Sequence, residues 1–478
     1  MSKAIYLLRR NSFFALSSAC IRLFSNAVLF VLIARFYGPE SFGQFTTAHT
    51  LATIFILLAD FGFDLLLTTQ IAANRDQASF LLPRMLALKL VFSLTASIIM
   101  CAVPVLGHLS PQAGKLTYIF CLYVFFSAVL NFFFALFKGH EEFQHETFIS
   151  FVLNIFLLLA LGTLGLMKAS LYWIAVVFIG SRILGLGLAV FRSKKYHIAI
   201  TPIWDAKWIW HVKNQVVFFG LFIIFGNLFF TLDTILLSFW KGDYQVGIYQ
   251  AVFRIIAITL VVPDIMINTL LPTLSRFYTA DKFKWRQLGA VASKTLFFIA
   301  LLLGFIIIFS AKDIIDIVYG YAKYDDAIPI LRVFGAIIII RYSVEVPALM
   351  LTTSDRQFIR MVLVIMATVL NYGINRFTIP SYGALGAAYA SLATNLLLGI
   401  GYFIAIRKRA PENWLTRERL LPLAIIVIGV IIMLYSPLPG WSGILVVTVL
   451  YLVAVFFMGY SAKEKGLLIK NITSLKLS

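Results

Sequence analysis

Charged side chains stand inside long apolar runs of this sequence, and some of them fall at helical spacing. Asp60 and Asp64 are four residues apart, so on a helix both carboxylates lie on one face. Burial and mutual repulsion favour uptake of a proton or a Na⁺ ion by such a pair. We name the pair as a candidate for ion coupling, and a structural role, through hydrogen bonds or a salt bridge to another helix, is the stronger alternative.

Arginines inside the apolar runs suggest a different chemistry. Arg22 and Asn26 share one helical face, and no carboxylate stands at helical spacing from Arg22. A guanidinium can bind phosphate with two parallel hydrogen bonds and keeps its charge when buried. Together with Arg182, Arg254 and Arg341, these residues predict a site for an anionic ligand. Several arginines around one cavity would suit a pyrophosphate.

Three further carboxylates lie within apolar runs, namely Asp233, Asp264 and Glu345. Glu345 is one helical turn from Arg341, so these two side chains can neutralise each other. A charge in the middle of a membrane span costs about 2.5–3.5 kcal/mol, so each group must face the protein interior, water or another charge. We add all three carboxylates to the first pair as candidates for ion coupling.

Long apolar segments must position these side chains. Of the 478 residues, 61% are hydrophobic and only 13% are charged, with a mean hydropathy of +0.93. Soluble domains are about 45–50% apolar and about 25% charged, so the composition predicts an all-α polytopic membrane protein. At roughly 20 residues per span there is room for about 14 transmembrane helices. The expected spans are residues 12–34, 45–69, 85–106, 116–137, 147–167, 171–191, 214–239, 248–274, 289–311, 328–352, 359–378, 384–406, 420–436 and 442–460.

The basic residues indicate how the chain crosses the membrane. Lys and Arg number 40 against 21 Asp and Glu, which gives a net charge of +19. They lie between the apolar runs rather than on one polar face, which argues against a nucleic-acid partner. They also gather in alternate loops, richest at residues 192–195, 282–286 and 407–409, and this bias predicts that both termini are cytoplasmic. The same loops are expected to contact anionic membrane lipid.

Several classes of site have no support in the sequence. Cys20, Cys101 and Cys121 all lie inside apolar runs, which argues against a disulfide framework and against a cysteine-based metal cluster. The sequence has no nucleotide-binding, serine-hydrolase or zinc-protease motif, so we expect no enzymatic activity, no cofactor and no bound metal. The enzyme alternative, a membrane glycosyltransferase or polymerase, would need a large outer loop, and the longest expected one is only residues 312–327.

A weak internal repeat relates two halves of the chain. At one constant offset three residues recur in identical form, Gly38 as Gly242, Gly43 as Gly247 and Asp60 as Asp264. An even number of spans separates the copies, so both halves have the same orientation in the membrane. The repeat predicts two like-oriented six-helix lobes plus two C-terminal helices, an architecture suited to alternating access. The expected parts are an N-terminal lobe at 1–195, a cytoplasmic linker at 196–213, a C-terminal lobe at 214–409, and two extra helices with a cytoplasmic tail at 410–478.

Five segments, taken in order, resemble a known family. Ala34–Phe45 and Leu58–Asp64 are similar to the opening of Wzx-type polysaccharide flippases. Three later segments also match, Phe137–Glu141, Ile330–Phe334 and Ile379–Ala388. The resemblance runs through nearly the whole chain. Wzx flippases belong to the multidrug/oligosaccharidyl-lipid/polysaccharide exporter superfamily.

This resemblance implies a function as well as a fold. Such proteins flip undecaprenyl-pyrophosphate-linked oligosaccharide, of the O-antigen or capsule type, across the bacterial cytoplasmic membrane, driven by an ion gradient. Their central cavity is described as cationic, which the four intramembrane arginines would fit, although no motif carries that role onto them residue by residue. A polysaccharide polymerase and chain-length proteins are further expected partners. The alternatives within the superfamily are a cation-coupled multidrug efflux transporter and an exporter of lipid II or of teichuronic type.

Overall fold

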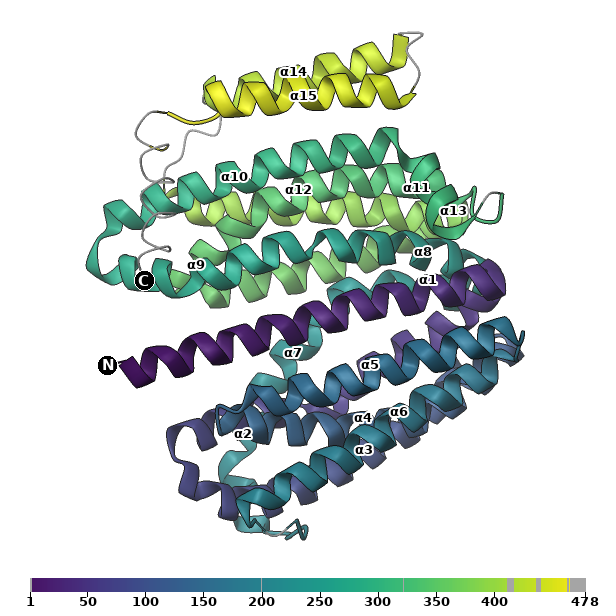
Figure 1. Cartoon of the computed structure of the whole chain (residues 1–478), viewed down its shortest axis with the longest axis vertical. Coiled ribbons are helices and arrows are strands. Elements are labelled where there is room, and N and C mark those ends of the chain that lie inside the picture. Colours follow the sequence, from purple (N-terminus) through teal and green to yellow (C-terminus); the bar gives the residue numbers. More distant parts are fainter. Residues whose placement is uncertain are drawn as a thin grey trace. The chain divides into compact units, whose positions relative to one another are not determined.

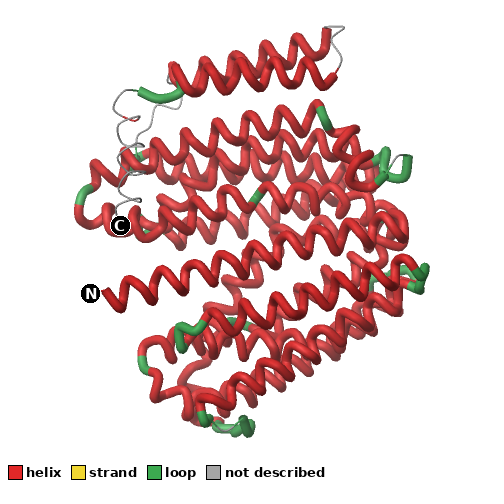
Figure 2. The backbone as a smooth tube through the Cα atoms, viewed as in Figure 1, coloured by secondary structure: helices red, strands yellow, loops and turns green. Residues whose placement is uncertain are grey.

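The chain is helical throughout the part that the structure describes. The structure is a computed structural model and describes residues 2–198, 200–320, 322–410, 417–435, 440–461 and 464. Within these residues there are α-helices, two short 3₁₀-helices and no strand (Figure 1, Figure 2). The all-α fold class that the composition predicts is confirmed.

Each expected span overlaps one or two of the observed helices. The N-terminal helices are α1 (Ser2–Asp60), α2 (Phe63–Ala73), α3 (Ala78–Leu106), α4 (Pro111–Gly139), α5 (Phe143–Leu166), α6 (Leu171–Ser193), α7 (Ala206–Trp240) and α8 (Asp243–Thr259). The C-terminal helices are α9 (Val261–Ala280), α10 (Lys282–Phe309), α11 (Ala311–Tyr319), α12 (Ala327–Thr353), α13 (Gln357–Arg407), α14 (Arg417–Tyr435) and α15 (Gly440–Met458). The two 3₁₀-helices are η1 (Arg75–Gln77) and η2 (Lys194–Tyr196).

These helices are compatible with the expected number of membrane crossings. Among the described residues, nine helices are long and apolar enough to cross a membrane, or ten with α8 and α9 taken together as one bent span. The count of single helices is lower than the count of expected spans partly because α1 and α13 each contain two spans, merged across a break at a glycine.

Single glycines form the breaks in the two longest helices. Gly38 in α1 has φ 78° and ψ 175°, and Gly383 in α13 has φ 58° and ψ −133°. Positive φ is strained for residues with a Cβ atom. Pro39 follows Gly38 directly, and its fixed φ suits the first turn of the next helical segment. Gly242, the repeat partner of Gly38, also has a positive φ of 82°.

The internal repeat also appears as a reciprocal backbone contact between α1 and α8. A side chain at Gly43 would collide with the backbone carbonyl group of Asp243. A side chain at Gly247 would likewise collide with the backbone carbonyl group of Pro39. Asp243 stands at the repeat position of Pro39, so the two contacts are related by a local twofold symmetry. Both copies of the repeat thus use their second glycine to let two backbones approach closely.

Packing divides the chain into two compact units. Unit 1 holds Met1–Ile258 and Asn375–Ala384, and unit 2 holds Thr259–Ile374 and Leu385–Ser478. This division follows packing, whereas the expected six-helix lobes follow the internal repeat. The boundaries of the lobes and of the linker between them stay a prediction.

Helix α4 forms the centre of unit 1. In its most apolar window 72% of the residues are buried, against 39% in α5 and in α6. The core beside α4 includes Leu67 of α2, Met85 of α3 and Phe133 of α4 itself. Helices α5 and α6 instead expose large apolar side chains such as Leu159 and Trp173. Such a surface suits surrounding lipid rather than water.

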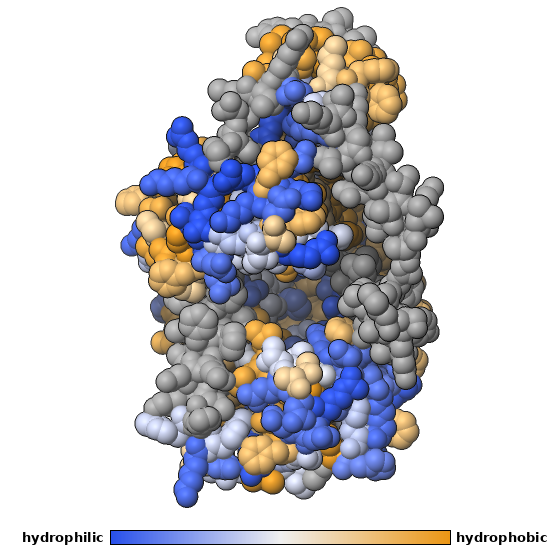
Figure 3. Space-filling view, turned by 90° about the vertical axis from the view of Figure 1, so that its left-hand side faces the viewer, coloured by the Kyte–Doolittle hydropathy of each residue, from blue (hydrophilic) through white to orange (hydrophobic). Residues whose placement is uncertain are grey.

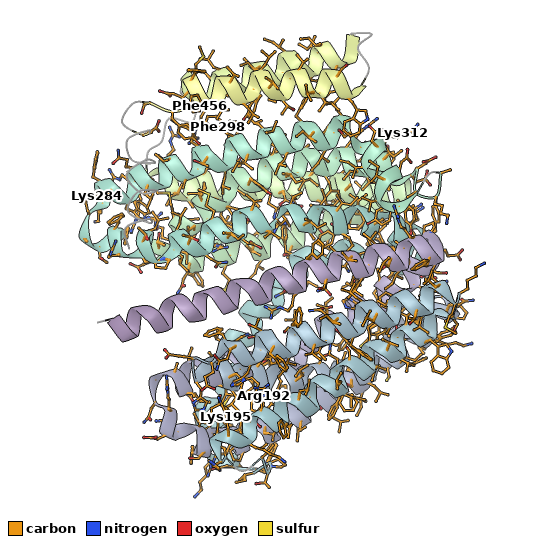
Figure 4. The ribbon with its side chains drawn as sticks, in the orientation of Figure 1. Arg192, Lys195, Lys284, Phe298, Lys312 and Phe456 are labelled. Carbon is orange, nitrogen blue, oxygen red and sulfur yellow. The ribbon has the colours of Figure 1, made fainter. Side chains whose placement is uncertain are left out.

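In unit 2, α10 packs along α12, and the pair α14–α15 packs on α10 (Figure 1). Gly304 and Gly335 allow the first of these contacts, because a Cβ atom at Gly304 would lie 2.8 Å from the Gly335 carbonyl oxygen. In the second contact, the Tyr451 hydroxyl of α15 donates a hydrogen bond of 2.8 Å to the Phe298 carbonyl oxygen of α10. Phe298 is buried in this packing, whereas Phe456 of α15 is 72% exposed (Figure 4).

Charged side chains lie near the ends of the helices. In unit 2, Lys284 stands at the start of α10 and Lys312 lies beyond its other end, whereas in unit 1 Arg192 and Lys195 lie where α6 finishes (Figure 4). Figure 3 shows hydrophilic side chains gathered on the left-hand face of Figure 1, with apolar ones among them. The basic loops expected to be cytoplasmic thus contribute exposed lysines at helix ends. The orientation of the chain in the membrane stays a prediction.

Candidate functional site

A cavity of about 640 Å³ lies in unit 1 between α1, α2, α4, α5 and α6. Its polar lining consists of Arg22, Asn26, Asp60, Asp64, Thr68, Tyr123, Ser127, Asn131, Lys138, Glu146, Ser150, Asn154 and Arg182. On α4 and on α5 these residues recur about every fourth position, so each helix presents one polar stripe to the cavity. The structure therefore brings together five residues that the sequence singles out, two of them arginines.

The Asp60 and Asp64 carboxylates are bridged by the ammonium group of Lys89 on α3. Lys89 Nζ lies 2.8 Å from Asp60 Oδ1 and 2.8 Å from Asp64 Oδ1. The Lys89 side chain is fully buried, whereas the two carboxylate side chains keep 14% and 22% of their surface exposed. This is the interhelical salt bridge that the sequence leaves open as the structural alternative to ion coupling. Whether the pair also couples an ion stays a prediction.

The local backbone around this pair differs from the expected continuous helix. The span expected at 45–69 is interrupted, because α1 ends at Asp60 and α2 begins at Phe63. Phe61 and Gly62 both have positive φ, 42° and 86°. Asp60 nevertheless stays next to Asp64, since its Oδ1 accepts a hydrogen bond of 3.0 Å from the Asp64 amide. The expectation of one helical face is therefore wrong, and a capped helix break brings the carboxylates together instead.

Arg22 has a carboxylate partner that comes from a distant helix. Its Nη1 lies 2.7 Å from Glu146 Oε1, and Lys138 Nζ lies 3.2 Å from Glu146 Oε2. Only 6% of the Glu146 side chain is exposed, against 42% of Arg22 and 38% of Lys138. Glu146 thus holds two cations at the cavity wall, and both remain accessible from the cavity.

The other two candidate arginines that belong to unit 1 lie against aromatic rings. Arg182 Nη2 donates a hydrogen bond of 2.9 Å to the Tyr123 hydroxyl, and its Cζ lies 5.1 Å from the centre of the Tyr123 ring. Arg254 Cζ lies 3.5 Å from the centre of the Phe30 ring. Such cation–π contacts hold a guanidinium in place without neutralising its charge. Arg182 lines the cavity and Arg254 packs on α1.

Two buried polar atoms of the cavity wall have no hydrogen-bond partner within the described residues, Ser127 Oγ and Arg182 Nε. Buried polar atoms are normally paired, and an unpaired one costs about 1–3 kcal/mol. Both residues line the cavity. A ligand or water with hydrogen-bonding oxygen atoms would satisfy these two groups.

Asp233 belongs to a separate buried network in unit 1. Its Oδ2 accepts a hydrogen bond of 2.7 Å from the Tyr249 hydroxyl, and its Oδ1 accepts one of 2.7 Å from Asn375 Nδ2. All three residues are buried. The network ties α7 to α8 and to the part of α13 that belongs to unit 1.

The remaining three candidates lie in unit 2. Arg341 Nε is 3.8 Å from Glu345 Oε1, so the expected pair within α12 is present. The charge of Arg341 also interacts with that of Asp264 on α9. Asp264 is exposed, and Glu345 is half-buried. The structure thus groups these three residues with one another within unit 2.

Charges of both signs balance in the cavity. Its cationic side chains are Arg22, Lys138 and Arg182, and its anionic ones are Asp60, Asp64 and Glu146. The buried ammonium of Lys89 adds one more positive charge behind the wall. Hydroxyl and amide groups complete a lining that can exchange hydrogen bonds with a polyhydroxylated ligand and still bind an anionic group.

A cluster at the turn between α4 and α5 fixes one end of this cavity. Glu142 accepts hydrogen bonds from Lys195 and Tyr196 at the end of α6, and Glu141 pairs with Arg75 at 2.8 Å. Burial raises the pKa of Glu142, but the hydrogen bonds from Lys195 and Tyr196 outweigh it and hold this pKa below its usual value. The cluster therefore anchors the two helix ends that carry Lys138 and Glu146.

Several residues in or behind the cavity wall are not among the charges predicted inside apolar runs. Lys89, behind the wall, stands near the start of its span, where it counts as a loop residue for topology, and the lining residues Lys138 and Glu146 lie at span ends. Neutral residues such as Asn131 and Asn154 carry no charge to attract notice. A search for polar residues repeated at every fourth position would have found the stripes on α4 and α5.

The fold resembles those of known transporters. The lipid II flippase MurJ, in an inward closed conformation, matches with a TM-score of 0.72 and 14% identity over 93% of this chain and 98% of that one. An inward-facing multidrug resistance transporter of the MATE family matches with a TM-score of 0.67 and 14% identity over 81% and 94%. A transporter from Pyrococcus furiosus matches with a TM-score of 0.59 and 13% identity over 85% and 95%. Helices and cavity together define a polytopic membrane protein with the fold of the multidrug/oligosaccharidyl-lipid/polysaccharide exporter superfamily.

The sequence identifies the family more closely. The family of polysaccharide biosynthesis proteins matches residues 8–278, which is more than half of the chain. The chain belongs to this family. A search of curated proteins finds no match. The resemblance to flippases of this superfamily is confirmed, and the molecule that the chain carries is a separate question.

Proposed function

We propose that this protein translocates undecaprenyl-pyrophosphate-linked oligosaccharide repeat units, of the O-antigen or capsule type, across the bacterial cytoplasmic membrane. The movement would use alternating access coupled to an ion gradient. The lipid tail can stay in the bilayer, whereas the polar headgroup needs a wet path, because hydrocarbon cannot satisfy its hydrogen bonds. Membership of a polysaccharide biosynthesis family supports this class of substrate.

The observation that carries the proposal is the lining of the cavity in unit 1. Amide and hydroxyl groups on α4 and α5 stand beside arginines, and Ser127 Oγ and Arg182 Nε are buried there without a partner in the described part of the chain. Hydroxyl-rich sugars and phosphate oxygens can supply what these groups lack. We therefore assign recognition of the headgroup to this wall.

The roles of single residues follow from chemistry and remain proposals. Binding of the anionic pyrophosphate and sugar is assigned to Arg22, Asn26, Arg182, Arg254 and Arg341. Ion coupling is assigned to Asp60, Asp64, Asp233, Asp264 and Glu345. The expected partners are membrane lipid, a polysaccharide polymerase and chain-length proteins. Both termini are proposed to be cytoplasmic.

A cation-coupled multidrug efflux transporter is the competing function. Efflux of cationic drugs calls for carboxylates that are free to pair with the drug. In this cavity Lys89 engages Asp60 and Asp64, and Arg22 with Lys138 engages Glu146. The paired state of these carboxylates favours the flippase over the efflux transporter. Export of lipid II or of a teichuronic-type polymer would use the same chemistry as the proposed function.

Lipid extraction from a strain that lacks this gene tests the proposal. The quantities to measure are undecaprenyl-pyrophosphate-linked oligosaccharide and surface polysaccharide, with the gene restored as the control. We expect the lipid-linked sugar to accumulate and the surface polymer to disappear, both reversed by the restored gene. Unchanged pools and an intact surface polymer would refute the proposal, and drug efflux would become the next assay.

A further inference from the structure

The ammonium group of Lys89 occupies the place between Asp60 and Asp64 that a bound metal cation would take. It lies 2.8 Å from one oxygen of each carboxylate. A Na⁺ ion placed between the two carboxylates would compete with the ammonium for these oxygen atoms. The Na⁺ ion would also lie beside the positively charged ammonium of Lys89. Repulsion between two buried positive charges is strong, because the protein interior screens charge poorly.

Lys89 cannot easily leave this place. Its side chain has no exposed surface, and its neighbours on α3, Met85, Leu86 and Leu88, belong to the apolar core. Movement away from the carboxylates would leave an unpaired ammonium among apolar side chains, and an uncompensated buried charge is strongly destabilising. The cation of this site is therefore tethered to the fold rather than exchanged with solvent.

We propose that Lys89 is the resident cation of the Asp60–Asp64 site and closes this site to Na⁺ and K⁺. The inference deepens the proposed function, because it removes a sodium gradient as the force that acts through these two carboxylates. Only this conclusion about the driving force rests on the proposed function. Occupancy of the site by Lys89 can be tested on the purified protein without any substrate.

A second buried lysine provides a matched control. Lys294 on α10 is also almost fully buried, with 7% of its side chain exposed. It pairs with Glu464 at 2.7 Å. Substitution of either lysine by methionine keeps an unbranched side chain, shorter by one heavy atom, and removes a buried positive charge. Only the Lys89 change leaves two adjacent carboxylates beside a cavity without their cation.

The experiment compares the apparent melting midpoint of the purified full-length protein in NaCl with that in choline chloride at equal concentration. Unfolding is monitored by tryptophan fluorescence. A ligand that binds only the folded state raises the midpoint, and choline is too large to replace Na⁺ between two carboxylates. We expect equal midpoints in the two salts for the wild type and for Lys294→Met. For Lys89→Met we expect a midpoint that rises with NaCl concentration, and the further change Asp64→Asn should abolish that rise.

Two outcomes would overturn the proposal. One is a Na⁺-specific rise in the wild type that Asp64→Asn removes, since the site would then bind Na⁺ with Lys89 in place. The other is a folded Lys89→Met protein with the same midpoint in both salts. Where Lys89→Met does not fold, the wild-type comparison decides alone. The export phenotype of the deletion strain does not enter this test, so failure here is distinct from failure of the proposed function.

Discussion

The Arg22 guanidinium and the Glu146 carboxylate form a salt bridge of 2.7 Å across 124 positions of the chain. The carboxylate is almost fully buried, whereas 42% of the Arg22 side chain is exposed. An anionic ligand in the cavity can therefore approach Arg22 from the side that faces away from Glu146. The salt bridge fixes the guanidinium at the cavity wall, where a ligand can reach it.

Replacement of Arg22 should reduce export more than it reduces membrane insertion. A hydrogen bond to a charged group contributes about 1.5–3 kcal/mol, so Arg22→Ala should lower export roughly tenfold or more. The measurement is surface polysaccharide per unit of inserted protein. Arg75→Ala is the matched control, since Arg75 pairs with Glu141 and both side chains are more than half exposed. Normal export by Arg22→Ala at native expression would remove Arg22 from the binding site.

The reciprocal glycine contact predicts steric effects in both copies of the repeat. Gly43→Ala and Gly247→Ala should each destabilise the protein by about 1–3 kcal/mol, because the new methyl group meets a backbone carbonyl that cannot rotate away. Gly162→Ala is the control, since nothing lies within 4 Å of a Cβ atom at that position. Thermal unfolding of the purified variants provides the comparison. Equal midpoints for all three variants would show that the two backbones do not stay in contact.

The anchor at Glu142 should depend on pH in one direction. Its folded-state pKa lies below the usual value because of hydrogen bonds from Lys195 and Tyr196, which outweigh the opposing effect of burial. A lowered pKa stabilises the fold above the unfolded-state value near 4.3, and this contribution disappears as the pH falls through the folded-state value. Glu142→Gln should therefore cost about 1 kcal/mol or less at pH 7, since the site is partly exposed.

Thermal unfolding of the wild type and Glu142→Gln from pH 7 to pH 3 measures this contribution. The gap between their midpoints should be present at pH 7 and should close below about pH 4.3. Glu141→Gln serves as the neighbouring control, because its exposed pair with Arg75 contributes little. A gap that stays constant over the whole range would mean that Glu142 acts through packing rather than through its charge.

Two cysteines should form a disulfide bond under mild oxidation. Cys101 Sγ on α3 and Cys121 Sγ on α4 lie 3.2 Å apart as free thiols. A chemical oxidant that accepts two electrons, with release of two protons, should join them with little backbone movement. Alkylation under denaturing conditions followed by peptide mass analysis should reveal one linked peptide pair, which Cys101→Ser eliminates. Recovery of both peptides in alkylated form after oxidation would place the two sulfur atoms farther apart.

The sequence predicts the helices and the repeat because both depend on local patterns. Apolar length defines a span regardless of its neighbours, and Gly38 with Gly242 recurs because both positions need a positive φ. Asp60 and Asp64 can be recognised as candidates because their spacing is also a local pattern. The helix break at Phe61 and Gly62 cannot be predicted in this way, because glycine is common within membrane helices and a single one rarely marks their end.

Partners from distant segments cannot be predicted in this way. Nothing near Arg22 in the sequence points to Glu146, and nothing near Asp64 points to Lys89. Such pairs depend on which helices pack together, and one sequence contains no record of that packing. The cavity itself therefore could not be predicted from the sequence. Its charged residues on α1 and α2 could be predicted as candidates.

The sequence separation of these ion-paired residues bears on the order in which the helices can be built into a membrane. Lys89 follows Asp60 by 29 positions and Asp64 by 25, so these three charges emerge from the ribosome in adjacent segments and can meet as soon as α3 enters the bilayer. The salt bridge between Arg22 and Glu146 can form only after α5 has been synthesised. During synthesis three further helices, α2 to α4, are therefore made before the Glu146 carboxylate is available to Arg22, and this salt bridge forms only when the fifth helix arrives.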